Sequence, residues 1–175
     1  MSFSVAEATN LNFAECLPAV VPSRKHSPRK FYERNRHRIY SLAFWMTDNE
    51  LAAEELMKRS FCRAFAQNED PDRDDVDRAL IAELREFLPL GKLKLTLRCA
   101  PCDQVCTVRR NTLRVDLERA VVQLPSTEKL IFLLHDVEGY DHAYVAHLIG
   151  ITEDDSCCAL HQARLRLREL LTKAK

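Results

Sequence analysis

The strongest constraint on the fold is a pair of helical patterns separated by a single glycine. The first pattern, DHAYVAHLI, is short and apolar, and Asp141 at its start is a residue type that caps helices well. Gly150 follows, and glycine readily adopts the left-handed conformation that ends a helix. Thr152 and Asp155 then approximate a capping box, so a second, longer helix is expected to begin there. This order predicts a helix-turn-helix.

The spacing of the second helix predicts which of its side chains face inward. The apolar positions that recur at helical steps are Ile151, Leu160, Ala163 and Leu167. The outer face, where a recognition helix meets a major groove, is expected to hold Asp155, Cys158, Ala159, Gln162 and Arg166. Helix pairs of this shape also occur as pure packing units, so the spacing alone leaves DNA binding open.

The rest of the chain is mostly helical in pattern. Apolar residues recur at three- and four-residue steps from Phe31 to Phe61, and further helical patterns cover about residues 77–88, 113–124 and 126–139. The intervening LGKLKLTLRC alternates apolar and basic residues, which favours a short strand or an extended linker. The predicted fold is all-α, with a mobile arm (1–28), a helical bundle (29–88), a flexible linker (89–111) and a second bundle (112–175).

The sequence lacks the motifs of several classes of enzyme. The three glycines are too few for a Gly-rich loop that cradles phosphates. His142 and His147 are five residues apart and miss the four-residue spacing of a zinc-protease helix. No Gly-x-Ser-x-Gly turn occurs either. The sequence therefore predicts a protein that is not an enzyme and needs no cofactor.

The charges are balanced overall but unevenly distributed. The formal net charge is zero, so no global field attracts nucleic acid. Residues 24–38 are nevertheless strongly basic, whereas residues 68–77 are strongly acidic. Such blocks are usually solvated faces, but the basic block is also suited to a polyanion or an acidic partner surface.

No feature of the sequence predicts a membrane or secreted protein. No apolar run approaches the roughly 18 residues that span a bilayer. The N-terminus lacks the basic-then-apolar order of a secretion signal. A cytoplasmic location is expected, where most of the seven cysteines are thiols.

The cysteines in the predicted linker are a weak candidate for a metal site. The stretch CAPCDQVC contains Cys99, Cys102 and Cys106, but a four-ligand zinc site usually needs a second pair of ligands. Plain thiols in a flexible segment are the alternative. A third hypothesis is a thiol or zinc sensor, because Cys157 and Cys158 lie on the predicted recognition helix. Cys16 and Cys62 are interpreted as ordinary small apolar residues.

Two segments resemble one known family. LPSTEKLIFLLHDVEGYDHAYVAHLIGI followed by LHQARLRLREL looks like region 4 of bacterial extracytoplasmic-function (ECF) sigma factors, over about residues 113–171. FYERNRHRIYSLAFWMTDNELAAEELMKRSFCRAFA is similar to region 2 of the same family. Together they cover over half the chain in the family's order.

The resemblance implies a dissociable subunit of RNA polymerase. Region 2 of the family docks on the clamp helices of the largest polymerase subunit, and the matching residues here are Glu54, Glu55, Leu56, Lys58 and Phe61. Region 4 places its second helix on the double-stranded −35 promoter element, and the matching residues are Asp155, Cys158, Ala159, Gln162, Arg164 and Arg166. An anti-sigma factor is a further partner that the resemblance implies.

The chain departs from the family pattern on the recognition helix. Cys157 stands where the family usually has lysine, Ala159 where it has arginine or glutamine, and Gln162 where it has a basic residue. Each loss removes a phosphate contact or a base contact, and a bidentate base contact contributes about 1–3 kcal/mol of discrimination. The sequence therefore predicts a divergent sigma factor, with a sigma-like interaction protein that reads no DNA as the alternative.

Overall fold

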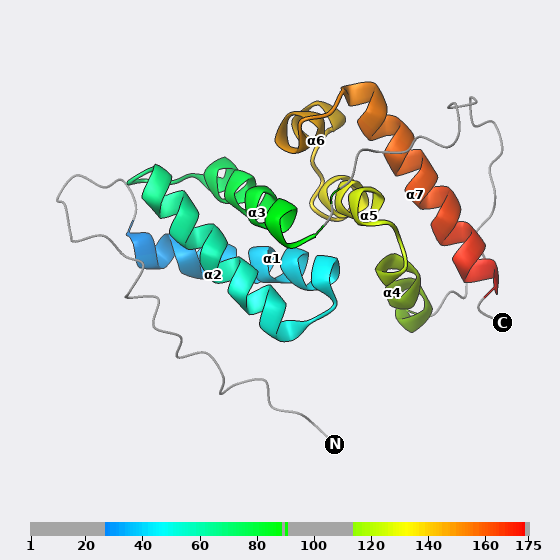
Figure 1. Ribbon diagram of the computed structural model, residues 1–175, viewed down its shortest axis with the longest axis horizontal. Helices are drawn as coiled ribbons and strands as arrows, with labels where there is room; N and C mark the ends of the chain where they lie inside the picture. The colour runs from blue at the N-terminus through cyan, green and yellow to red at the C-terminus, as the bar shows by residue number, and fades with distance from the viewer. Residues whose placement is uncertain (1–26, 89, 91–113, 174–175) are drawn as a thin grey trace, which may run out of the picture.

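The computed structural model describes residues 27–88, 90 and 114–173, and this part of the chain consists of helices joined by short turns (Figure 1). The predicted arm (1–28, apart from its last two residues) and linker, with Cys16, Cys99, Cys102 and Cys106, lie outside the described residues. No described residue is in a β-strand, so the all-α prediction is confirmed. The helices are α1 (Pro28–Thr47), α2 (Glu50–Gln67), α3 (Arg73–Phe87), α4 (Arg114–Val122), α5 (Ser126–Phe132), the π-helical turn η2 (Leu133–Val137), α6 (His142–Ile149) and α7 (Glu153–Lys173).

The N-terminal half, residues 27–88, is a bundle of α1, α2 and α3. Pro28 starts α1, where its missing N–H costs no hydrogen bond. Asp48 ends α1 in the left-handed conformation, and Asn49 then caps α2 by accepting a hydrogen bond from the Ala52 N–H at 3.0 Å. The fully buried side chains that join the three helices are Ile39, Leu56, Phe61, Leu80 and Leu84.

The acidic block has a structural role at the start of α3. The Asp72 carboxylate accepts from the Asp75 N–H at 2.9 Å, and the Asp75 carboxylate accepts from the Asp72 N–H at 3.1 Å. This reciprocal capping box satisfies two backbone donors that a helix N-terminus otherwise leaves unpaired.

The C-terminal half, residues 114–173, contains the predicted helix-turn-helix. Asp141 caps α6 by accepting from the Tyr144 N–H at 2.7 Å. Gly150 ends α6 with φ 75°, and its N–H and that of Ile151 both donate to the Ala146 carbonyl. The Thr152 hydroxyl accepts from the Asp155 N–H at 3.1 Å and starts α7. The predictions at Asp141 and Gly150 are confirmed, and of the predicted capping box the bond to the Thr152 hydroxyl is present.

A π-helical turn links α5 to the helix-turn-helix. The Glu138 N–H donates to the Leu133 carbonyl five residues earlier, instead of four as in an α-helix. Leu133 and Leu134 are buried in the core, whereas Val137 is 59% exposed. The turn therefore admits one extra residue while the core contacts of η2 are kept.

The two halves pack against each other. α3 contacts α6, and α1 contacts α4 and α5, as the arrangement in Figure 1 shows. Buried apolar residues of both halves belong to one hydrophobic cluster. Whether each predicted domain folds independently stays a prediction. No helix among residues 27–88 and 114–173 meets the length and apolarity needed to cross a membrane.

The buried Phe61 provides a test of the N-terminal core. Its ring is inaccessible to solvent and packs edge-on against Phe31 and Tyr32, with centroid distances of 6.4 and 4.9 Å. Phe61→Ala is expected to lower the free energy of unfolding by about 3–5 kcal/mol, measured by urea denaturation. Leu51→Ala is the control: this side chain is 79% exposed, so its loss is expected to change the free energy of unfolding by less than about 0.5 kcal/mol. Equal effects of the two substitutions would contradict the predicted core.

Candidate nucleic-acid interface

Helix α7 has one buried face and one exposed face. The buried face holds the small or apolar side chains Ser156, Ala159, Leu160, Ala163 and Leu167, which pack against α5 and α6. The residues of the opposite face recur at three- and four-residue steps and are exposed or partly exposed: Asp154, Cys157, His161, Arg164 and Arg168. This second set is named the outer stripe of α7.

The predicted outer face is wrong for two residues. Ala159 is 0% exposed and Gln162 is 5% exposed, so neither side chain can enter a groove in this arrangement. The exposed side chains lie about one residue before the predicted ones along α7. The reason is that the small side chains of Ser156 and Ala159 allow α7 to approach its neighbours closely. Their three-residue spacing was the signal in the sequence for the packed face. Asp155 and Cys158 are partly exposed and flank the stripe.

Both arginines predicted to contact DNA are ion-paired within the chain. The Arg164 guanidinium binds the Asp136 carboxylate through two bonds, Nη2–Oδ1 at 2.6 Å and Nε–Oδ2 at 3.0 Å. Burial opposes the charge of Asp136, but hydrogen bonds from Arg164 and His135 outweigh it and hold the pKa of Asp136 below its usual value. Arg166 Nε lies 3.1 Å from Oε2 of Glu128. These pairs fix α7 against η2 and α5, and a phosphate has to compete with them.

The first turn of α7 is acidic. Glu153, Asp154 and Asp155 all lie at the positive end of the helix macrodipole, where each contributes about 0.3–1 kcal/mol to helix stability. The same carboxylates repel a phosphate backbone that approaches this end. The first turn therefore stabilises the fold and weakens a contact with DNA.

The described cysteines take two forms. Cys157 is an exposed free thiol, and burial together with Glu153 and Asp154 raises its pKa, which favours the protonated form. Cys62 and Cys158 each belong to a disulfide, so the interpretation of Cys62 as an ordinary small apolar residue is wrong. Within residues 27–88 and 114–173, no cluster of three or more His, Cys, Asp or Glu is arranged to hold a metal ion.

The predicted polymerase-binding residues divide between the core and the surface. Leu56 is 1% exposed and Phe61 is 0% exposed, so both stabilise the bundle and neither presents its side chain to a partner. Glu55 is exposed, Lys58 is partly exposed, and both share a helical face with the highly exposed Leu51. Leu51, Glu55 and Lys58 are named the α2 stripe, which Glu54 flanks. The sequence-based prediction did not include Leu51. It could have been found as an apolar residue that does not follow the spacing of the core residues of α2.

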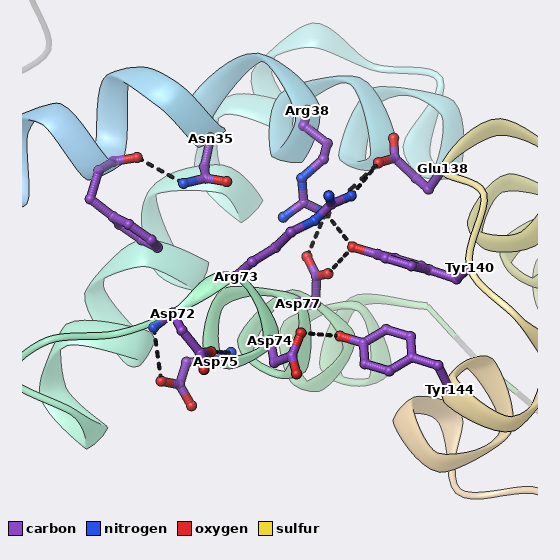
Figure 2. Close-up of polar contacts among 11 residues, drawn as sticks. Asn35, Arg38, Asp72, Arg73, Asp74, Asp75, Asp77, Glu138, Tyr140 and Tyr144 are labelled. Atoms are coloured by element: carbon purple, nitrogen blue, oxygen red, sulfur yellow. Dashed lines mark hydrogen bonds and ion pairs between the residues drawn. The ribbon is translucent and has the colours of Figure 1, made fainter.

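A group of charged and aromatic side chains joins the two halves (Figure 2). The Tyr140 hydroxyl donates to the Asp77 carboxylate and accepts from Arg38 Nη1 at 3.2 Å. Arg38 Nη1 also lies 2.6 Å from Asp77 Oδ1. Arg73 Nη2 donates to Glu138 Oε2 at 3.2 Å, and its guanidinium carbon lies 4.9 Å from the centre of the Tyr140 ring. These five residues, Arg38, Arg73, Asp77, Glu138 and Tyr140, are named the interdomain polar cluster.

Asp77 is the most deeply buried member of the cluster. Its side chain is 2% exposed, and burial raises its pKa, while the Arg38 guanidinium and the Tyr140 hydroxyl oppose that rise. Burial and the hydrogen bond to Asp77 also raise the pKa of Tyr140, which keeps the phenol protonated as a donor. The charge of Asp77 therefore depends on groups from both halves of the chain.

Two contacts flank the interdomain polar cluster. The Tyr144 hydroxyl donates to Asp74 Oδ1 at 2.8 Å, and Arg85 donates to the carbonyl of Ile149. α6 is thereby held on α3 at both ends.

Comparison with known proteins defines the class to which this geometry belongs. Residues 114–167 match the family described as "Sigma-70, region 4". The chain is also similar to a solved structure of the sigma factor RpoE in complex with the anti-sigma factor NepR from Bartonella quintana. The sequence identity is 14%, the match covers 84% of this chain and 98% of that chain, and the TM-score is 0.62. No curated protein matches the sequence.

The described residues thus have the fold of a sigma factor, and the C-terminal half carries a sigma-70 region 4. The predicted resemblance to sigma factors is confirmed for the fold and for residues 114–167.

Removing the Tyr140 hydroxyl tests the interdomain polar cluster. Tyr140→Phe deletes a donor to the buried Asp77 and an acceptor for Arg38, so it is expected to lower the free energy of unfolding by about 1–2 kcal/mol. Tyr144→Phe is the matched control, because its hydroxyl bonds to Asp74 at an exposed site, and it is expected to cost less than about 0.5 kcal/mol. Chemical denaturation of both variants measures the difference. A Tyr140→Phe protein as stable as the native chain would contradict the importance of the cluster.

A histidine pair makes the stability of the helix-turn-helix depend on pH. The His135 and His142 rings stack with centroids 4.3 Å apart, and His142 Nδ1 lies 3.0 Å from the Ser156 hydroxyl. Burial lowers the pKa of His142, and His135 and Arg164 lower it further, against the opposing charges of Glu153 and Asp136.

A lowered pKa means that the unfolded chain binds the proton of His142 more readily than the folded chain. Above about pH 6.5, the pKa of His142 in the unfolded chain, His142 is expected to leave the free energy of unfolding unchanged. As the pH falls from there through the lower pKa of His142 in the folded chain, the free energy of unfolding is expected to decrease. Melting temperatures at several pH values between about 5 and 8 measure the effect. His142→Gln should show a smaller loss on acidification, and an unchanged pH profile would contradict this origin.

Proposed function

We propose that the protein is a sigma factor that binds core RNA polymerase and directs promoter-specific initiation, with region 4 contacting the −35 element. The observation that carries the proposal is a helix-turn-helix, inside a sigma-70 region 4, whose second helix keeps one continuous outer stripe. A recognition helix needs such a stripe to lie in a major groove. Arg168 and His161 on the stripe are the polar groups that reach DNA without breaking an ion pair of the described residues.

The α2 stripe is the surface that best suits the polymerase. Leu51 is a large apolar side chain on the surface, and Glu55 and Lys58 lie beside it on the same helical face. An apolar side chain within a polar rim is the arrangement of a protein–protein interface. The resemblance to region 2 of the ECF family implies that the clamp helices of the largest polymerase subunit occupy it.

The electrostatics of α7 favour weak contact with DNA. A phosphate that approaches Arg164 competes with the bidentate Asp136, and the three acids of the first turn add repulsion. Promoter binding is therefore expected to require the polymerase, which supplies the remaining DNA contacts.

A second candidate function follows from the same electrostatics. The protein would be a sigma-like interaction protein that binds polymerase or an anti-sigma factor and reads no DNA. The acidic first turn of α7 and the internal pairing of Arg164 and Arg166 favour this alternative. The similar RpoE was solved in complex with an anti-sigma factor, which makes such a protein a candidate partner here.

A transcription assay with purified core polymerase tests the proposal. The native chain is expected to support run-off transcription from members of a promoter library. Leu51→Ser should weaken polymerase binding by about tenfold or more, because it removes the apolar anchor of the α2 stripe without affecting the core. Val115→Ser is the control, since Val115 is 52% exposed but lies on α4. Equal binding by both variants would remove the α2 stripe as the docking surface.

Footprinting of the same complexes separates the two candidate functions. Protection of the −35 element supports the sigma factor. Polymerase binding without any −35 protection, on every promoter tested, supports the interaction protein.

A further inference from the structure

A hollow of about 980 Å³ lies between the first half of α1 and the turn that precedes α3. From α1 it is lined by Lys30, Phe31, Arg34, Asn35 and Arg38, with Ser27 at the helix start, and from the turn by residues 70–73. Its volume is at the upper end of the range for small-molecule sites, about 300–1,000 Å³. Neither the helix-turn-helix nor the α2 stripe contributes to it.

Cations dominate the lining of the hollow. Lys30, Arg34 and Arg38 are spaced four residues apart on α1, so they form one row about 12 Å long, and Arg73 adds a fourth cation from α3. Within residues 27–88 and 114–173, Lys30 and Arg34 make no ion pair. Of the two acids in the lining, Asp72 is committed to the capping box of α3. A row of this length suits more than one anionic group.

The start of α1 reinforces the positive charge of the hollow. The first turn contains no acidic residue, and Ser27 at the N-cap makes no side-chain capping bond. Of the row, Lys30 lies in this first turn, at the positive end of the macrodipole, where like charge is unfavourable and an anion is stabilised by uncapped N–H groups. Arg38 also has one buried nitrogen, Nη2, with no hydrogen-bond partner in the described residues.

The wall of the hollow also offers groups for a heterocyclic ring. Phe31 is partly exposed, and its ring is held by edge-on contacts with Phe61 and Phe65. Asn35, only 9% exposed, donates through Nδ2 to the Phe31 carbonyl at 2.9 Å, and its amide oxygen bonds to no other described residue. An aromatic face beside a fixed amide is suited to stacking and hydrogen bonding with a base.

We propose that this hollow binds a nucleoside polyphosphate, with the phosphates on Lys30, Arg34 and Arg73 and the base against Phe31 and Asn35. Two of its arginines, Arg38 and Arg73, are also the cations of the interdomain polar cluster, as Figure 2 shows. Arg73 reaches Glu138 at 3.2 Å and Arg38 reaches it at 3.9 Å. Phosphates in the hollow compete with Glu138 for Arg73, so ligand binding weakens the contact of Glu138, which directly follows η2, with α3.

Calorimetric titration of the full chain with ATP tests the site. Arg34→Glu is expected to weaken binding about tenfold or more, because it reverses a charge of the row without touching the C-terminal half. Arg114→Glu is the matched control: it reverses the charge of an exposed arginine on α4, outside the hollow, and should bind ATP like the native chain. Native affinity in Arg34→Glu, or no ATP binding by the native chain, overturns the proposal.

A single-stranded oligonucleotide and tripolyphosphate, used as separate probes, identify the source of the phosphates. ATP is expected to bind more tightly than tripolyphosphate, because only ATP brings a base to Phe31 and Asn35. Binding of the oligonucleotide without binding of ATP overturns the assignment to a free nucleotide.

Hydrogen exchange measures the competition with Glu138. ATP is expected to slow the exchange of backbone amides in the first half of α1 and to speed it in residues 138–149. Slower exchange in both segments would mean that the ligand tightens the contact of residues 138–149 with α3, and this would overturn the competition.

Discussion

The arrangement of the two halves depends on one buried carboxylate. Asp77 is supplied by the N-terminal half, but its hydroxyl donor, Tyr140, belongs to the C-terminal half. A buried charge that loses a partner is costly, because its desolvation is then no longer compensated. Separation of the halves therefore has to be accompanied by hydration of Asp77, and this requirement makes the closed arrangement cooperative.

The helices and their boundaries could be predicted well from the sequence. The signals at Asp141, Gly150 and Thr152 are local: each depends on the conformation and hydrogen bonding of a few neighbouring residues, so no knowledge of the tertiary structure is needed. The face of α7 could not be predicted as reliably. Helical spacing defines a stripe only to within about one residue, and the choice between His161 and Gln162 as the outward residue depends on how closely α5 and α6 approach.

Contacts between distant parts of the chain were the hardest to predict. Arg38, Asp77 and Tyr140 are ordinary surface residue types in helical or turn patterns, and nothing local indicates that they meet. The same holds for Arg164, which the resemblance predicts to contact DNA, because its partner in the structure, Asp136, lies on η2. A resemblance to a family locates side chains along the chain, whereas their availability depends on the neighbours that the fold supplies.

The π-helical turn η2 has a consequence for two ion pairs, Asp136 with Arg164 and Glu138 with Arg73. One extra residue in a helix rotates everything after it by about 100° relative to a regular α-helix. Asp136 lies inside this turn and Glu138 directly follows it, so the insertion sets the directions in which one carboxylate meets Arg164 and the other meets Arg73. A relative with a regular α-helix here would keep its leucine core but point these acids elsewhere. The extra residue of this helical turn can thus determine whether Glu138 forms the ion pair that holds the C-terminal half on α3.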